Sequence, residues 1–119
     1  MISQKSLAAI VTILFLVSGL QAFVFIDGVA NFNYFQTGKL FEVGSGDRTD
    51  NRYIAFTPPF ATAPRIILAI KELDVSNQSN VRIDTYPTDV SRDGFSLNVH
   101  TWDQTKIYSV AISWIAYTP

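Results

Sequence analysis

Residues 94–116 read GFSLNVHTWDQTKIYSVAISWIA, and this stretch decides the fold. Successive side chains of a β-strand point to opposite faces, so each half of the stretch has one apolar face. In the first half this face carries Phe95, Leu97 and Val99, opposed by Ser96, Asn98 and His100. In the second half it carries Val110, Ile112 and Trp114, with Tyr108 at its end, opposed by Ser109, Ala111 and Ser113. The alternation predicts two strands and makes Trp114 a core residue.

The chain beyond Asp27 continues the strand signature and shows no helical period of any length. Segments rich in Val, Ile, Thr, Tyr and Phe recur between turn residues, which predicts six strands and an all-β fold. The predicted strands cover residues 36–42, 52–56, 65–73, 81–90, 94–101 and 106–116. The turns Arg92-Asp93-Gly94 and Asp103-Gln104-Thr105 predict hairpins. Because Ile66–Ile70 is apolar on both faces, we expect a second sheet or another subunit to cover it.

The first part of the chain has a different composition. Lys5 precedes an apolar run from Leu7 to Val17, and small residues follow between Ser18 and Ala22. This order predicts a secretory signal peptide over residues 1–22, cleaved within the small-residue segment. The alternative is an uncleaved membrane anchor, because apolar residues continue through Ile26.

The rest of the chain suits one ordinary globular domain. Behind the signal we place an N-terminal extension over 23–35 and a single domain over 36–119, and we expect the mature protein to be extracellular without membrane insertion. The 119 residues carry a formal charge of -1 and no basic run, so nucleic acid and anionic membranes are not expected partners. The absence of cysteine excludes disulfides, thiolate metal sites and thiol nucleophiles.

The sequence gives little support for catalysis. Its single histidine, His100, lies mid-strand without a hydrolase or metalloprotease motif, so we expect it to be structural. The carboxylates available for a glycosidase pair are Asp74, Asp84 and Asp89, and the sequence places no two of them across a cleft. No helix pattern follows Gly44-Ser45-Gly46-Asp47, and Asp47–Asp50 lacks the calcium-loop spacing. We predict no enzyme, no metal and no cofactor, with an unrecognised hydrolase as an alternative.

A better candidate for function combines an aromatic and a basic residue. Trp102 ends the fifth predicted strand on its polar side, where an indole is either an interface residue or an exposed stacking platform. Arg82 opens the fourth strand, and it is either a solvated charge or a planar fork of donors for vicinal hydroxyls. If these loops converge, aromatic faces together with Arg and Asp side chains would make a sugar site.

Several short sequence segments resemble those of the H-type lectin domain, and they occur in the same order with compatible gaps. They are Phe56-Thr57-Pro58-Pro59-Phe60-Ala61-Thr62-Ala63-Pro64-Arg65-Ile66, Leu73-Asp74-Val75, Asn80-Val81-Arg82, Gly94-Phe95, Thr101-Trp102-Asp103-Gln104-Thr105-Lys106-Ile107-Tyr108 and Ser113-Trp114-Ile115-Ala116. Gln36-Thr37-Gly38-Lys39 also looks like the family's opening strand, so the resemblance covers about residues 36–116.

The resemblance implies a six-stranded antiparallel β-sandwich that assembles as a homotrimer or a hexamer. It implies binding of glycans with terminal galactose or N-acetylgalactosamine, in clefts shared between neighbouring chains. Several weak sites on one rigid oligomer gain avidity from clustered glycans. The implied protein is therefore a secreted, multivalent lectin acting in agglutination, cell adhesion or recognition, and not an enzyme.

The family's sugar-contacting positions fall on six residues of this chain. They are Gly46, Asp47, the sugar-gripping Arg82, the stacking Trp102, Asp103 and the aromatic partner Tyr108. Asp50 is the alternate to Asp47, because the loop is shorter here than in snail agglutinins. Some members have His where this chain has Asp103, so a donor near the sugar ring has become an acceptor. The choice between galactose and N-acetylgalactosamine therefore stays open.

Two further expectations remain beside this one. A β-sandwich that binds protein or only assembles itself, with a degenerate sugar cleft, is the alternative function, with Trp102 and Tyr108 as interface anchors. Asn77-Gln78-Ser79 matches the acceptor pattern for N-glycosylation in a polar loop.

Overall fold

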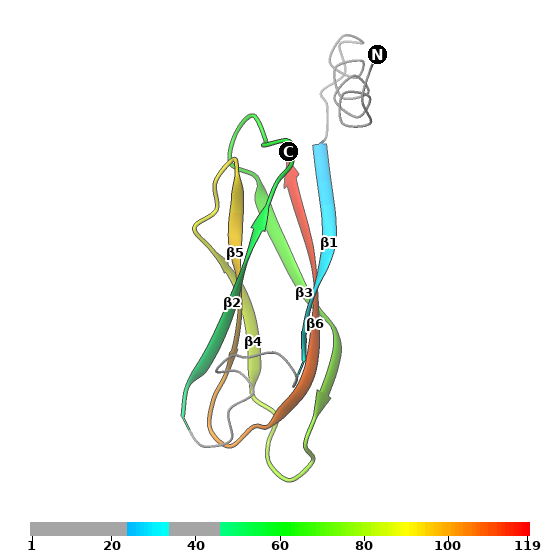
Figure 1. Ribbon diagram of the computed structural model, residues 1–119, viewed down its shortest axis with the longest axis vertical. Coiled ribbons are helices and arrows are strands. Elements are labelled where there is room, and N and C mark those ends of the chain that lie inside the picture. The colour runs from blue at the N-terminus through cyan, green and yellow to red at the C-terminus, as the bar shows by residue number, and fades with distance from the viewer. Residues whose placement is uncertain (1–23, 34–45) are drawn as a thin grey trace.

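A computed structural model describes residues 24–33 and 46–119, and these residues form two facing three-stranded sheets (Figure 1). The strands are β1 (Val24–Asn33), β2 (Arg48–Ala55), β3 (Arg65–Val75), β4 (Ile83–Thr88), β5 (Gly94–Thr101) and β6 (Ile107–Thr118). All strand pairs are antiparallel, in the orders β1-β6-β3 and β2-β5-β4. The predicted all-β, six-stranded antiparallel sandwich is confirmed. The described residues include no helix that is long and apolar enough to cross a membrane.

The core lies between the sheets and is built by the two central strands, β5 and β6. The predicted core residues Phe95, Leu97, Val99, Val110, Ile112 and Trp114 are all buried. Phe56 and Phe60 extend this core past the end of β2, where their rings meet edge to face at 5.0 Å between centroids. The period-two alternation in residues 94–116 therefore identified the core correctly, because both strands bury one large apolar face; the opposite face is polar in β5 and carries mainly small residues in β6 before Ile115.

Strand β1 is an addition to the expected sandwich. It pairs with β6 along its whole length, from Val24 opposite Thr118 to Asn33 opposite Ser109. The segment 23–35, which the sequence suggested as an N-terminal extension, therefore contains a strand of the sheet. The first residues of β1 are apolar and directly follow the predicted signal peptide, so the alternation typical of a strand was not recognisable there. The predicted signal over 1–22 and the predicted strand over 36–42 lie outside the described residues.

One of the two predicted hairpins is confirmed and the other is wrong. Strands β4 and β5 pair in one sheet across the turn that contains Asp93. Strands β5 and β6, in contrast, belong to opposite sheets, so Trp102–Lys106 crosses from one layer of the sandwich to the other (Figure 1). Turn residues signal a reversal of direction, but they do not tell whether the returning strand pairs with its predecessor or packs across the core from it.

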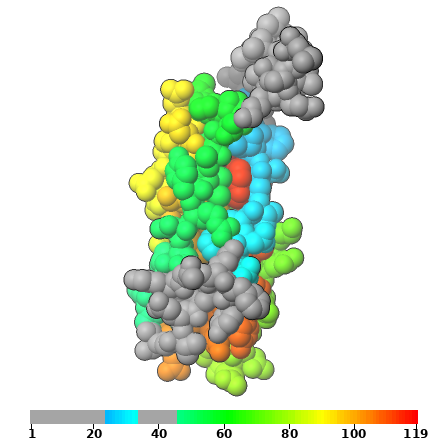
Figure 2. Space-filling view, in the orientation of Figure 1, coloured from blue at the N-terminus to red at the C-terminus, as the bar shows by residue number. Residues whose placement is uncertain are grey.

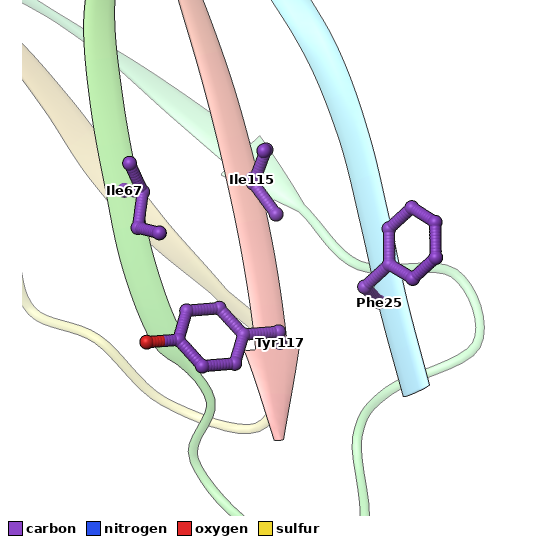
Figure 3. A pocket seen from close by; sticks show the side chains of 4 residues that line it. All are labelled: Phe25, Ile67, Ile115 and Tyr117. Carbon is purple, nitrogen blue, oxygen red and sulfur yellow. The ribbon is translucent and has the colours of Figure 1, made fainter. Parts of the chain in front are cut away.

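The outer face of the β1-β6-β3 sheet is apolar near the C-terminus. Phe25, Ile67, Ile115 and Tyr117 line an open groove there of about 310 Å³ (Figure 3). Ile67 of β3 is 50% exposed, so residues 24–33 and 46–119 leave the second side of the doubly apolar β3 segment largely uncovered. In the space-filling view β2 and β1 face the viewer, and β6 is visible only in part between and below them (Figure 2).

Candidate functional site

Buried polar residues gather at the end of the sandwich away from the C-terminus. Among the described residues the buried polar side chains belong to Arg48, Asn98, Thr101 and Thr105. All but Asn98 lie where three segments meet: residues 46–48 at the start of β2, residues 80–82 before β4 and the crossing segment 102–106 that follows β5. Burying a polar side chain is unfavourable unless it is hydrogen-bonded. Within the described part of the chain, every fully buried side-chain nitrogen or oxygen accordingly has a hydrogen-bond partner.

The two threonines fix the segment before β4 to the crossing segment. The Thr105 hydroxyl donates to the Asn80 carbonyl at 2.7 Å and accepts from the Arg82 backbone N–H at 3.0 Å. The Thr101 hydroxyl donates to the Arg82 carbonyl at 2.6 Å. Both backbone polar groups of Arg82 are thus bonded to a buried hydroxyl. The backbone from which the Arg82 side chain projects is held at two points.

Arg48 connects the remaining segment to the same place. Its Nε donates to the Gly46 carbonyl at 3.2 Å, and its Nη2 donates to the Asp103 carbonyl at 2.9 Å. The Arg48 residue is 6% exposed, so its guanidinium is a buried link between two loops that are 55 positions apart in the chain. Sequence reasoning missed Arg48, Thr101 and Thr105, because charged and hydroxyl residues near strand ends ordinarily face water.

Arg82 and Asp103 form an exposed ion pair at the site. Arg82 Nε lies 3.2 Å from Asp103 Oδ2, and the two side chains are 39% and 57% exposed. Such an exposed ion pair contributes little to stability. Among the described contacts this guanidinium is engaged through its Nε alone, so its terminal N–H groups are available as donors. The structure therefore brings these two predicted site residues together.

Trp102 lies on the outer face of the β2-β5-β4 sheet, as its predicted place on the polar side of β5 requires. Its ring stacks on that of His100, with 5.0 Å between centroids and 20° between planes. His100 Nδ1 lies 3.1 Å from Asp84 Oδ1 on β4, and His100 Nε2 lies 3.5 Å from Asp47 Oδ1. The predicted structural role of His100 therefore takes the form of contacts with three neighbours at the candidate site.

The structure separates the two candidate acceptors of the loop before β2. Asp47 is at the outer face beside His100, and the left-handed φ of 104° at Gly46 suits glycine in this turn. Asp50 lies directly opposite Val99, whose side chain is in the core, and residues directly opposite in a sheet share a face. The Cα–Cβ bond of Asp50 therefore points to the inner face of the sheet, whereas Trp102 lies on the outer face.

Tyr108 differs from its predicted position on the core face. Asp74 pairs with Ser109 and Val75 with Ile107, so Tyr108 is the extra residue of a β-bulge in β6. The bulge turns its side chain outward, where it is 38% exposed. Among the described residues no hydrogen bond or ring contact joins Tyr108 to Arg82 or Trp102, and the ring instead lies 5.4 Å from Lys106 Nζ.

These groups suit recognition of a polyhydroxylated ligand. Arg82 offers donors, Asp47 and Asp103 offer acceptors, and the Trp102 ring offers an apolar face beside them. Within residues 24–33 and 46–119 no cluster of His, Cys, Asp or Glu side chains is arranged to hold a metal ion.

Comparison with known proteins gives a match to a family of lectins. The model of the H-type lectin domain family matches residues 51–117. One of the discoidin-1 chains of Dictyostelium discoideum is 32% identical over 74 residues, which are 61% of this chain and 29% of that protein. A Fuscovulum blasticum protein, ATP synthase subunits region ORF 7, is 27% identical over 85 residues, which are 71% of this chain and 74% of that protein. The chain thus spans less than a third of discoidin-1.

Solved structures agree on the fold. The native structure of recombinant discoidin II of Dictyostelium discoideum superposes with a TM-score of 0.70 and 19% identity, covering 82% of this chain and 40% of that chain. At this identity the likeness concerns the fold alone. Together with the family match over more than half of the chain, it leaves one assignment. The chain belongs to the H-type lectin domain family, a family of carbohydrate-binding proteins.

Proposed function

We propose that this protein is a secreted lectin that binds glycans with terminal galactose or N-acetylgalactosamine at the end of the sandwich where residues 46–48, 80–82 and 102–106 meet. Two neighbouring contact groups support the proposal: the exposed Arg82–Asp103 ion pair, and Trp102 and Asp47, which both contact His100. Buried bonds hold the backbones beneath them. A rigid, exposed set of donors, acceptors and one indole is what weak, reversible sugar binding requires, and it includes no covalent step.

Each residue has a distinct role in this proposal. The free N–H groups of Arg82 donate to two neighbouring sugar hydroxyls, as a planar guanidinium can. Asp47 accepts from a hydroxyl, and the apolar C–H face of the sugar ring packs on Trp102. Tyr108, turned outward by its bulge, completes the cleft from a neighbouring chain or from its own.

Asp103 bears on which sugar is preferred. Its carboxylate accepts hydrogen bonds, either from a free hydroxyl or from the N–H of an acetamido group, and it repels the carbonyl oxygen of that group. A free hydroxyl can donate without bringing a carbonyl oxygen close to Asp103. We therefore propose that galactose binds at least as well as N-acetylgalactosamine.

The proposal includes assembly of identical chains. The apolar groove lined by Phe25, Ile67, Ile115 and Tyr117 supports it, because exposed apolar surface of this kind commonly marks a protein contact. A single sugar site of this type binds with a Kd of roughly 1 mM or somewhat tighter. A homotrimer, or a hexamer built from two, would raise the avidity for clustered glycans by about 100-fold or more.

A glycan array probed with the secreted protein tests this function. Binding should concentrate on terminal galactose and N-acetylgalactosamine, and an Arg82→Ala variant should lose it. The other candidate is a self-assembling or protein-binding sandwich, which the exposed apolar groove also favours. An array without signal, given by an intact oligomer, would select that alternative.

A further inference from the structure

We infer that His100 is a positioning residue that makes sugar binding depend on pH, through its contacts with Asp47, Asp84 and Trp102. The inference rests on the proposed function, because it concerns the same site. His100 lies on the middle strand of its sheet, with Trp102 stacked on its ring and a carboxylate near each ring nitrogen. Its side chain is 23% exposed, whereas those of Asp84 and Asp47 are 54% and 81% exposed. It is thus the least exposed member of this group of three.

The two nitrogens of His100 cannot both donate in the neutral ring. A neutral imidazole has one N–H, and its other nitrogen is an acceptor. The 3.1 Å contact with Asp84 assigns that hydrogen to Nδ1, by geometry. The lone pair of Nε2 then faces the Asp47 carboxylate, 3.5 Å away, and two acceptors repel each other. The imidazolium, in contrast, donates to both carboxylates at once.

Protonation of His100 therefore decides whether the Asp47 carboxylate is held. Arg48 fixes the backbone just before Asp47 through the Gly46 carbonyl, but that bond does not reach the Asp47 side chain. With the second proton, Nε2 holds one carboxylate oxygen of Asp47 and leaves the other free to accept from a sugar hydroxyl. A group fixed before binding loses less entropy when the ligand arrives.

The other charged groups near the site have separate partners or face elsewhere. Arg82 pairs with Asp103, and Arg48 is buried with bonds to two carbonyls. Asp50 starts on the inner face of the sheet, opposite Val99. Aspartate side chains ordinarily stay ionised down to about pH 4, so histidine is the side chain that changes charge between about pH 8 and pH 5.

The direction of the pH dependence follows from the thermodynamic linkage between proton binding at His100 and sugar binding. If the protonated form binds sugar more tightly, affinity rises as the pH falls through the range where imidazoles ordinarily titrate, around pH 6.5. By reciprocity, bound sugar must favour the protonated form of His100 by the same factor. For one exposed, charge-assisted hydrogen bond we expect an increase in affinity of about two- to fivefold between about pH 8 and pH 5.

The experiment measures the affinity of the intact oligomer for galactose across this pH range and, in parallel, the NMR titration of the imidazole signals. The chain has one histidine, so these signals belong to His100 alone. A His100→Phe variant retains a stacking ring and removes both donors, and a His100→Gln variant retains one donor that does not titrate. Both should bind at every pH with the affinity of the wild type near pH 8. Ser96→Ala, on the same face of β5, is the matched control and should keep the pH dependence.

The outcomes separate this inference from the function on which it rests. If the wild type binds galactose equally well across the range, and sugar leaves the His100 titration unchanged, the positioning role is wrong and the lectin assignment stands. If affinity instead decreases as the pH is lowered, protonated His100 competes with the sugar for Asp47. The pH dependence then has the opposite direction, and the inference is wrong. If the oligomer binds neither galactose nor N-acetylgalactosamine at any pH, both proposals fail together.

Discussion

Trp102 and Trp114, the two tryptophans of the chain, are predicted to respond in opposite ways to removal. Trp114 is 9% exposed and packs against Phe56 and Phe95, so Trp114→Ala should lower the free energy of unfolding by about 3–5 kcal/mol. Trp102 stacks at the surface on His100, so Trp102→Ala should keep the melting temperature and lose binding to galactose resin. Thermal melts and resin binding on both variants decide this, and equal destabilisation by both would contradict it.

Arg82 allows a test of charge against geometry. Arg82→Ala should weaken binding by about tenfold or more, the loss expected for a charge-assisted hydrogen bond, while unfolding changes by less than about 1 kcal/mol. Arg82→Lys should recover little, because an ammonium group cannot donate in parallel to two hydroxyls. Both variants are measured by calorimetric titration with galactose. Full recovery by Lys would mean that Arg82 acts only as a charge.

Arg48 is the third residue whose change is informative, because it acts from beneath the site. Arg48→Met keeps the aliphatic length but removes the bonds to the Gly46 and Asp103 carbonyls, so two loops lose their common link. We expect weaker galactose binding together with a loss of about 1–3 kcal/mol of stability. Arg52→Met is the control: its guanidinium lies over the Phe32 ring at 4.4 Å, away from the two loops, and its loss should leave affinity unchanged.

At the scale of elements, β1 offers a direct test of its place in the sheet. A Cβ added at Gly28 would lie 2.6 Å from Cζ2 of the Trp114 indole, so Gly28→Ala forces β1 and β6 apart or displaces the ring. Overpacking of this kind costs about 1–3 kcal/mol. Chemical denaturation should show that loss, with galactose binding retained below the transition. Unchanged stability would mean that residues 24–33 are an extension outside the sandwich.

The strands were largely predictable, and the site was predictable only in part. β5 begins and ends where the alternation of its residues predicted, because one of its faces packs in the core along its whole length and the other is polar. β1 was missed because its apolar residues follow the predicted signal without a break. The bulge at Tyr108 was missed because a surplus residue depends on the partner strand, which a single sequence does not specify. Arg48 was missed because burial of a charge depends on loops distant in the chain.

At the scale of the whole molecule, the proposed homotrimer, with the exposed groove as its contact surface, is tested by molecular mass. Light scattering should give about three times the mass of one chain, independent of reductant, because the chain has no cysteine. Ile115→Lys places a charge in the groove at a position that is 38% exposed, so it should yield a folded protein of lower mass. Ile54→Val, a change on the other sheet, serves as control. A trimer that survives Ile115→Lys would place the contact elsewhere.

The bulge in β6 has a consequence for how such a protein can change over generations. Tyr108 has no pairing position of its own in the ladder between β3 and β6, so a different residue there leaves every neighbouring pair in register. Substitutions can therefore accumulate at position 108 while the pairing of β3 with β6 stays unchanged. Under the proposed function, selection on ligand preference and selection on folding would act at this position almost independently.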